Sequence, residues 1–75
     1  MKTVQISLNS IDKVKSFVND ITKFDYDFDL VSGRYVIDAK SILGILSMDL
    51  TRELTVRCYG ESKRFNEVIA KFAVA

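Results

Sequence analysis

The sequence predicts an open-faced sandwich, a fold in which helices cover one face of a four-stranded sheet. Three short segments alternate apolar and polar residues, which is the period of a strand with one buried face, and a fourth segment resumes extended structure after a turn. Two longer segments repeat apolar residues at intervals of three and four, the period of an amphipathic helix. All of these apolar faces can be buried together only if both helices lie on the same side of a single sheet.

The first strand and the first helix are predicted near the start of the chain. Apolar and polar residues alternate from Val4 to Leu8, and Asn9 and Ser10 then end the strand and can cap a helix. From Ile11 onward the helix carries its apolar residues on one stripe. These residues are Val14, Phe17, Val18 and Ile21.

The middle of the chain is predicted to form a β-hairpin. An extended segment from Tyr26 to Leu30 leads to Ser32-Gly33, a turn signal, and extended structure resumes from Tyr35 to Ile37.

The last part of the chain is predicted to contain a fourth strand and a closing helix. Leu54, Val56 and Cys58 alternate with polar neighbours, so Cys58 is expected to be an unreactive core residue. The apolar residues of the closing helix again follow intervals of three and four. They are Phe65, Val68, Ile69 and Phe72.

Length, charge and cysteine content restrict the class of protein. Seventy-five residues are enough for one small domain, so we expect a single domain over residues 1–75. Eleven basic and ten acidic side chains nearly cancel, which disfavours partners such as nucleic acid or an anionic membrane. The longest apolar stretch, Ile42 to Leu50, is too short to cross a bilayer, and no secretory signal follows Met1. With a single cysteine as well, we expect a cytoplasmic protein.

Three aspartates alternate in the sequence like the start of a calcium-binding loop. They are Asp25, Asp27 and Asp29. Leu30 stands where that loop needs glycine, and Val36 stands where it needs its closing glutamate. We therefore expect a solvated strand face here, with no metal site, and no residue pattern predicts a cofactor.

A short helix is predicted between the hairpin and the fourth strand. Ser41 precedes Ile42–Leu46 and can cap it, whereas Gly44 weakens it. Six apolar residues within nine positions spread over too wide an arc for all of them to face one sheet, so some must stay exposed. They are Ile42, Leu43, Ile45, Leu46, Met48 and Leu50. This surplus is consistent with a partner contact or with a segment that folds back into the core.

The segment Val36–Ser47 resembles the central motif of HPr, the histidine-containing phosphocarrier of the bacterial sugar phosphotransferase system. The shared features are the Lys40-Ser41 pair, Gly44 and Ser47, in register. The order of elements (βαββαβα) is also similar. The resemblance implies an α+β, HPr-like open-faced β-sandwich, a four-stranded antiparallel sheet with the helices packed on one side.

The resemblance does not include the phosphotransfer residue. In the family, the loop after the first strand carries Gly-x-His-x-Arg-Pro, whose histidine accepts the phosphoryl group. The corresponding stretch here, Leu8–Val14, contains none of these residues, and the whole chain has no histidine. No other side chain replaces an imidazole that titrates near neutral pH, so we predict no catalytic residue and no phosphohistidine relay. An acyl phosphate on Asp12 remains an alternative, although nothing nearby predicts the metal site that such chemistry usually uses.

Ser41 has two interpretations. It matches the serine that, in Gram-positive relatives, is phosphorylated by an ATP-dependent HPr kinase and then enables binding to a transcriptional regulator of carbon use. A phosphoryl group there would meet the helix N-terminus, with Lys40 beside it. Simple helix capping explains the same residue type, and both interpretations stay open.

The resemblance also implies a binding surface, because Ile42, Leu43 and Leu46 match partner-facing apolar positions of the family. The full set of candidate contact residues is Lys40, Ile42, Leu43, Leu46, Ser47 and Met48. We therefore predict a non-enzymatic module that binds a phosphotransferase-system or carbon-regulation protein, with HPr kinase among the implied partners. The alternatives are a phosphocarrier with a non-histidine acceptor and a self-associating structural module.

Overall fold

A computed structural model describes residues 2–60 and 63–74 of the chain. Its elements follow the predicted order: β1 (Lys2–Ile6), α1 (Ile11–Ile21), β2 (Phe28–Ser32), β3 (Tyr35–Asp38), α2 (Ile42–Leu46), β4 (Leu54–Cys58) and α3 (Lys63–Ile69). The strands form one antiparallel sheet with the order β1-β4-β2-β3. The predicted α+β open-faced sandwich is confirmed.

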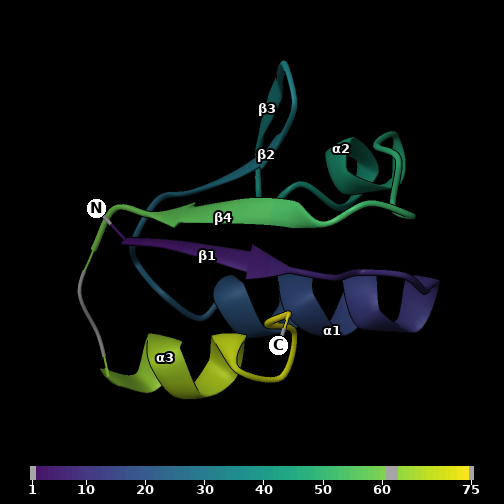
Figure 1. Ribbon diagram of the computed structural model, residues 1–75. Coiled ribbons are helices and arrows are strands. Elements are labelled where there is room, and N and C mark those ends of the chain that lie inside the picture. Colours follow the sequence, from purple (N-terminus) through teal and green to yellow (C-terminus); the bar gives the residue numbers. More distant parts are fainter. Residues whose placement is uncertain (1, 61–62, 75) are drawn as a thin grey trace.

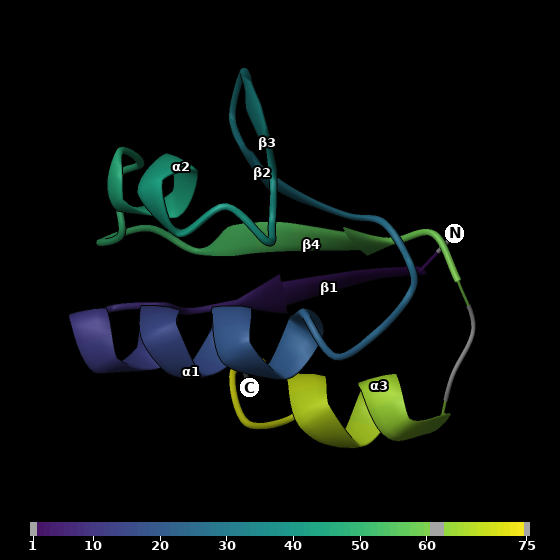
Figure 2. The ribbon, with the colours of Figure 1, turned by 180° about the vertical axis from the view of Figure 1, so that it is seen from behind.

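The two longer helices lie together, and the short helix lies beside the hairpin. In both views α1 and α3 lie side by side along β1, and they contact each other (Figures 1 and 2). The short helix α2 lies beside the β2–β3 hairpin and contacts both α1 and β3. The hairpin itself projects from the rest of the ribbon.

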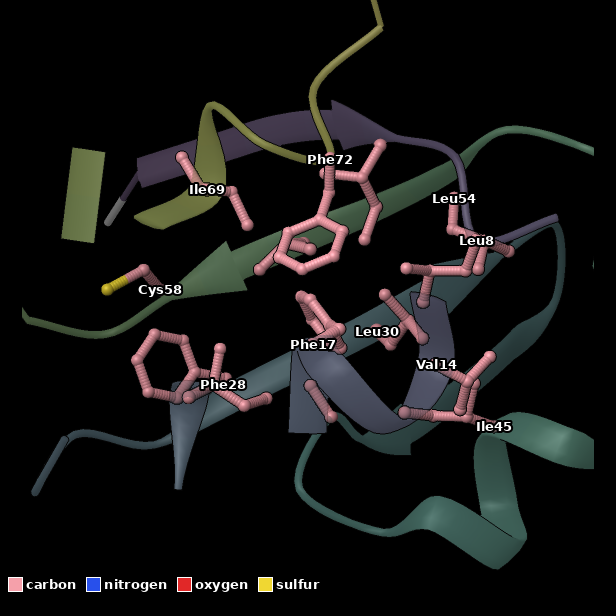
Figure 3. Packing of buried hydrophobic residues seen from close by; sticks show 14 of the residues in the cluster. Leu8, Val14, Phe17, Phe28, Leu30, Ile45, Leu54, Cys58, Ile69 and Phe72 are labelled. Atoms are coloured by element: carbon pink, nitrogen blue, oxygen red, sulfur yellow. The ribbon is translucent and has the colours of Figure 1, made fainter. Parts of the chain in front are cut away.

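The core lies between the sheet and the helices (Figure 3). Leu54, Val56 and Cys58 of β4 are fully buried, whereas Thr55 and Arg57 between them are only partly buried. The alternation therefore assigned the two faces of this strand correctly. The other buried apolar residues come from every helix, from β1 and β2, and from segments outside the named elements, whereas β3 contributes none. They are Ile6, Leu8, Val14, Phe17, Ile21, Phe28, Leu30, Ala39, Ile45, Phe65, Ile69 and Phe72.

Helix α1 begins where the sequence predicted. Ser10 has an extended backbone, and its Oγ accepts a hydrogen bond from the Lys13 N–H at 3.2 Å. This contact satisfies one of the amide groups that the first helical turn leaves without an intrahelical partner.

The hairpin turn is Gly33-Arg34. Gly33 has a φ of +56°, a left-handed conformation that glycine adopts without steric cost. Ser32 pairs with Tyr35 across the turn, and Leu30 pairs with Ile37 further along the ladder. Ile37 is partly buried and packs against the core, so the odd-numbered residues of β3 face the helices.

Several element ends differ from the prediction. Leu8 lies beyond β1, Tyr26 precedes β2 and Phe72 follows α3, although Leu8 and Phe72 are buried. The reason is tertiary: the Ser7 N–H donates to the Phe72 carbonyl at 2.9 Å, and the Val74 N–H donates to the Gln5 carbonyl at 3.0 Å. The end of the described chain thus pairs with β1 and carries Phe72 into the core.

The prediction that the three aspartates lie on one strand is correct for only one of them. Asp29 lies in β2, whereas Asp25 and Asp27 lie in the exposed segment before it. The strand begins later than the alternation predicted, and Tyr26, in the segment before it, packs on Gly60 and beside the ring of Phe28.

Candidate protein-binding surface around α2

Ser41 caps the short helix. Its Oγ accepts a hydrogen bond from the Gly44 N–H at 3.2 Å, and its carbonyl accepts one from the Ile45 N–H at 3.0 Å. The predicted capping role is confirmed, and the residue is exposed to solvent. Capping uses a lone pair of the hydroxyl oxygen and leaves the side chain accessible at the surface.

Gly44 has a second role that the sequence did not predict. A Cβ on this residue would lie 3.2 Å from Ser41 Oγ and 3.3 Å from Ile37 Cδ1. Both distances are tighter than ordinary van der Waals contact, so the absence of a side chain lets α2 approach β3 and its own cap closely. Glycine weakens the helix and also makes this packing possible.

The rotation of α2 decides which apolar residues are exposed. Ile45 is fully buried in the core, whereas Leu43 is 79% exposed and Leu46 is 43% exposed. Ile42 and Met48 are partly buried against the core. The prediction that some of this segment must stay exposed is confirmed. We call Lys40–Leu43 and Leu46–Met48 together the α2 surface.

A depression of about 420 Å³ lies between the hairpin and the segment that follows α2. Ser47 and Met48 line one side of it, and Tyr35 and Ile37 line the other. Ser47 also donates its hydroxyl to the Gly44 carbonyl at 2.6 Å, which closes the helix. No local pattern could predict this depression, because its two walls come from different elements.

The Lys40 ammonium was expected to lie beside a phosphoryl group on Ser41, but the structure places it elsewhere. Its Nζ donates to the backbone carbonyl of Phe24 at 2.8 Å and lies 5.6 Å from the centroid of the Phe28 ring. The side chain is partly buried. In this structure the ammonium group joins two loops of the fold.

The remaining candidates belong to other elements. Asp12 is exposed in the first turn of α1. Cys58 is buried, and its thiol donates to the Gly60 carbonyl at 3.2 Å, which agrees with the predicted core position. Within residues 2–60 and 63–74, no group of three or more carboxylate, thiol or imidazole side chains could hold a metal ion. None of the helices in the same ranges is long and apolar enough to span a bilayer.

A polar pair that no local sequence pattern predicted joins β2 to the residue after β4. The Tyr59 hydroxyl donates to Asp29 Oδ2 at 2.6 Å. This hydrogen bond raises the pKa of Tyr59 above its usual 10.0, with a smaller contribution from desolvation, while a hydrogen bond with Arg57 opposes the shift. Asp29 is paired in register with Arg57, so only the strand order brings these residues together.

The structure is similar to solved structures of HPr proteins. It matches HPr-C-His from Thermoanaerobacter tengcongensis with a TM-score of 0.80 and 20% identity, over 96% of this chain and 91% of that chain. It also matches the phosphocarrier protein HPr from Bacillus anthracis strain Ames with a TM-score of 0.72 and 25% identity, over 95% and 93%. No protein-family model and no curated protein sequence matches the chain. The fold is therefore HPr-like, as the Val36–Ser47 motif predicted.

Proposed function

We propose that this chain is a non-enzymatic protein-binding module related to the sugar phosphotransferase system of bacteria. It works in the cytoplasm, binds a phosphotransferase-system or carbon-regulation protein through the α2 surface, and is controlled by phosphorylation of Ser41. The observation that carries the proposal is the exposure of Leu43 and Leu46 on a helix capped by an exposed serine. Apolar side chains grouped at a surface favour a contact with a protein partner.

A chain without histidine cannot carry a phosphohistidine. The HPr-like fold without this residue retains the scaffold and loses the acceptor, which favours regulation by binding over phosphoryl relay. The competing role, a phosphocarrier with an aspartyl acceptor, rests on Asp12 alone. That residue is an exposed carboxylate in the first turn of α1.

Phosphorylation of Ser41 would change the charge of the α2 surface. A phosphoryl group adds a charge of about −1.5 to −2 beside Leu43, where a positively charged partner residue could bind it. Lys40 is the basic side chain nearest in sequence, and its ammonium would have to leave the Phe24 carbonyl to reach this group. While Lys40 stays on the Phe24 carbonyl, phosphorylation would place an uncompensated negative charge beside the apolar side chain of Leu43.

The first experiment is intact-mass analysis after incubation with ATP and a bifunctional HPr kinase. We expect the wild type and Ser47→Ala to gain one phosphoryl group and Ser41→Ala to gain none. Ser47 is the matched control, because it is an exposed serine at the other end of the same helix. Phosphorylation of Ser41→Ala, or none of the wild type, would remove the regulatory part of the proposal.

The second experiment measures binding. Unmodified and phosphorylated protein are titrated with enzyme I and with the carbon-use regulator of a Gram-positive bacterium. We expect Leu43→Ser and Leu46→Ser to weaken any complex at least tenfold, since buried apolar anchors carry much of the energy of small interfaces. Unchanged affinity in both variants would exclude the α2 surface as the binding site.

Incubation with enzyme I and phosphoenolpyruvate tests the aspartyl alternative. This alternative predicts that the wild type gains the mass of one phosphoryl group and that Asp12→Asn does not.

A further inference from the structure

Strand β3 is an open edge of the sheet. The order β1-β4-β2-β3 places β1 and β3 at the two edges. Residues 72–74 cover part of the β1 edge through the Ser7–Phe72 and Val74–Gln5 hydrogen bonds. By contrast, Tyr35 is 74% exposed and Val36 is 52% exposed, and the hairpin projects from the rest of the ribbon (Figures 1 and 2).

The backbone of β3 is oriented for pairing with another strand. In an antiparallel ladder, successive residues direct their N–H and C=O groups alternately to the two sides. The Ala39 N–H donates to the Phe28 carbonyl at 3.0 Å, so the backbone groups of Asp38 and Val36 are directed away from β2. The N–H and C=O of Val36 and the N–H of Asp38 are therefore available to a strand that adds to the open edge. The Asp38 carbonyl also accepts a hydrogen bond from the Ser41 N–H at 3.0 Å, so pairing there would use its second lone pair.

The side chains of this edge are self-complementary. The segment reads Arg34-Tyr35-Val36-Ile37-Asp38, with a positive charge at one end, a negative charge at the other and three residues that favour strands between them. We propose that β3 is a self-association edge that pairs antiparallel with β3 of a second copy, about a two-fold axis at Val36. Val36 then faces Val36 of the second copy, Arg34 faces Asp38, and Tyr35 faces Ile37.

The charges select this register. Opposite charges directly across a ladder stabilise it, and like charges destabilise it. A register centred on Ile37 would place Arg34 opposite Lys40, and one centred on Tyr35 would leave Asp38 opposite Ser32. A shift by a single residue would turn the apolar face of one copy to the wrong side of the joined sheet. Pairing about Val36 is the arrangement in which both ion pairs form.

The joined sheet would also fill the depression beside the hairpin. Ile37 and Met48 line this depression on the helix side of β3. In the proposed register, Tyr35 of the second copy lies opposite Ile37, so its exposed ring would lie toward the depression. A two-fold axis at Val36 gives the same contact twice, as the symmetry of a homodimer requires.

The test is sedimentation velocity over a hundred-fold range of protein concentration that reaches the millimolar range, because a contact this small gives a weak dimer. We expect the wild type to shift from monomer to dimer and Val36→Pro, which removes an outward N–H, to stay monomeric. Amide spectra of each variant verify that it is folded. Leu46→Ser is the control for the α2 surface and should dimerise like the wild type.

Charge reversal tests the register itself. Arg34→Glu makes both ends of the segment Arg34–Asp38 acidic, and Asp38→Lys makes both ends basic, so each variant alone should be monomeric at concentrations where the wild type dimerises. An equimolar mixture of the two should dimerise again, because opposite charges then face each other. The proposal is wrong if the wild type stays monomeric in the millimolar range, if the mixture does not associate, or if Leu46→Ser abolishes the dimer.

Discussion

The ammonium group of Lys40 binds the backbone carbonyl of Phe24 at an Nζ···O distance of 2.8 Å. The two residues are sixteen positions apart, one in the loop before α2 and the other in the loop after α1. The same ammonium lies over the ring of Phe28, which packs against Phe65 of α3. Lys40 therefore connects the segment that carries Ser41 to the aromatic part of the core.

Removal of this ammonium should destabilise the fold. Lys40→Met keeps most of the apolar stem but leaves the Phe24 carbonyl without its donor, so we expect the free energy of unfolding to fall by about 1–2 kcal/mol. Urea denaturation measures the loss. Lys15→Met is the control, because Lys15 is exposed on α1 and should change stability by less than about 0.5 kcal/mol. Equal effects of the two substitutions would contradict the structural role of Lys40.

The cap of α2 should contribute to stability independently of any phosphorylation. Ser41→Ala removes the acceptor of the Gly44 N–H, and we expect it to lower the free energy of unfolding by about 1 kcal/mol. Ser41→Asp should recover most of this loss, since aspartate caps helices as well as serine does. Thermal and urea unfolding of the three proteins measure the difference. If Ser41→Ala were as stable as the wild type, the cap would not contribute.

The exposed and buried residues of α2 should respond differently to substitution. Leu43→Ser removes a side chain that is 79% exposed, so it should leave the free energy of unfolding nearly unchanged. Ile45→Ala opens a cavity in the core and should cost about 2–5 kcal/mol. Chemical denaturation measures both. A large loss of stability in Leu43→Ser would mean that this leucine packs in the fold and is not free for a partner.

Gly60 should not tolerate a side chain. A Cβ on Gly60 would overlap the ring of Tyr26, which packs directly on the glycine. We expect Gly60→Ala to destabilise the protein by about 1–3 kcal/mol through overpacking.

A double-mutant cycle with Tyr26→Ala tests this contact. Because the ring is the obstacle, Gly60→Ala should cost much less in the Tyr26→Ala background than in the wild type. Additive effects of the two substitutions would show that the overlap is not the cause.

Tyr59 should titrate at higher pH than an ordinary tyrosine. Its hydroxyl donates to Asp29, which favours the protonated phenol and raises its pKa above 10.0. The folded pKa exceeds the unfolded one, so the stabilising contribution is present below about pH 10 and is lost as the pH rises through the raised pKa.

Tyrosine ring NMR signals followed against pH measure this shift. Asp29→Asn should lower the pKa of Tyr59 toward its usual value. The matched substitution Asp27→Asn, in an exposed neighbouring carboxylate, should leave it raised. A pKa of Tyr59 that is the same in wild type and Asp29→Asn would exclude the hydrogen bond as its cause.

The sequence alone determined the features that depend on local repetition and local capping. The alternation of Leu54, Val56 and Cys58 identified the buried face of β4, and the turn at Gly33 identified the hairpin. The caps of both α1 and α2 were predictable because a serine hydroxyl reaches an amide three residues away without help from the rest of the fold. The apolar surplus around α2 predicted that part of this segment would be exposed.

Only the tertiary structure decided which residues those are and what surrounds them. A five-residue helix has too few turns to define its own buried face, so Ile45 entering the core determines that Leu43 and Leu46 point outward. The position of the Lys40 ammonium, the Tyr59–Asp29 pair and the depression beside the hairpin all join residues distant in sequence. Local periodicity contains no information about such contacts, because they depend on the order in which strands pair and on how the helices pack against them.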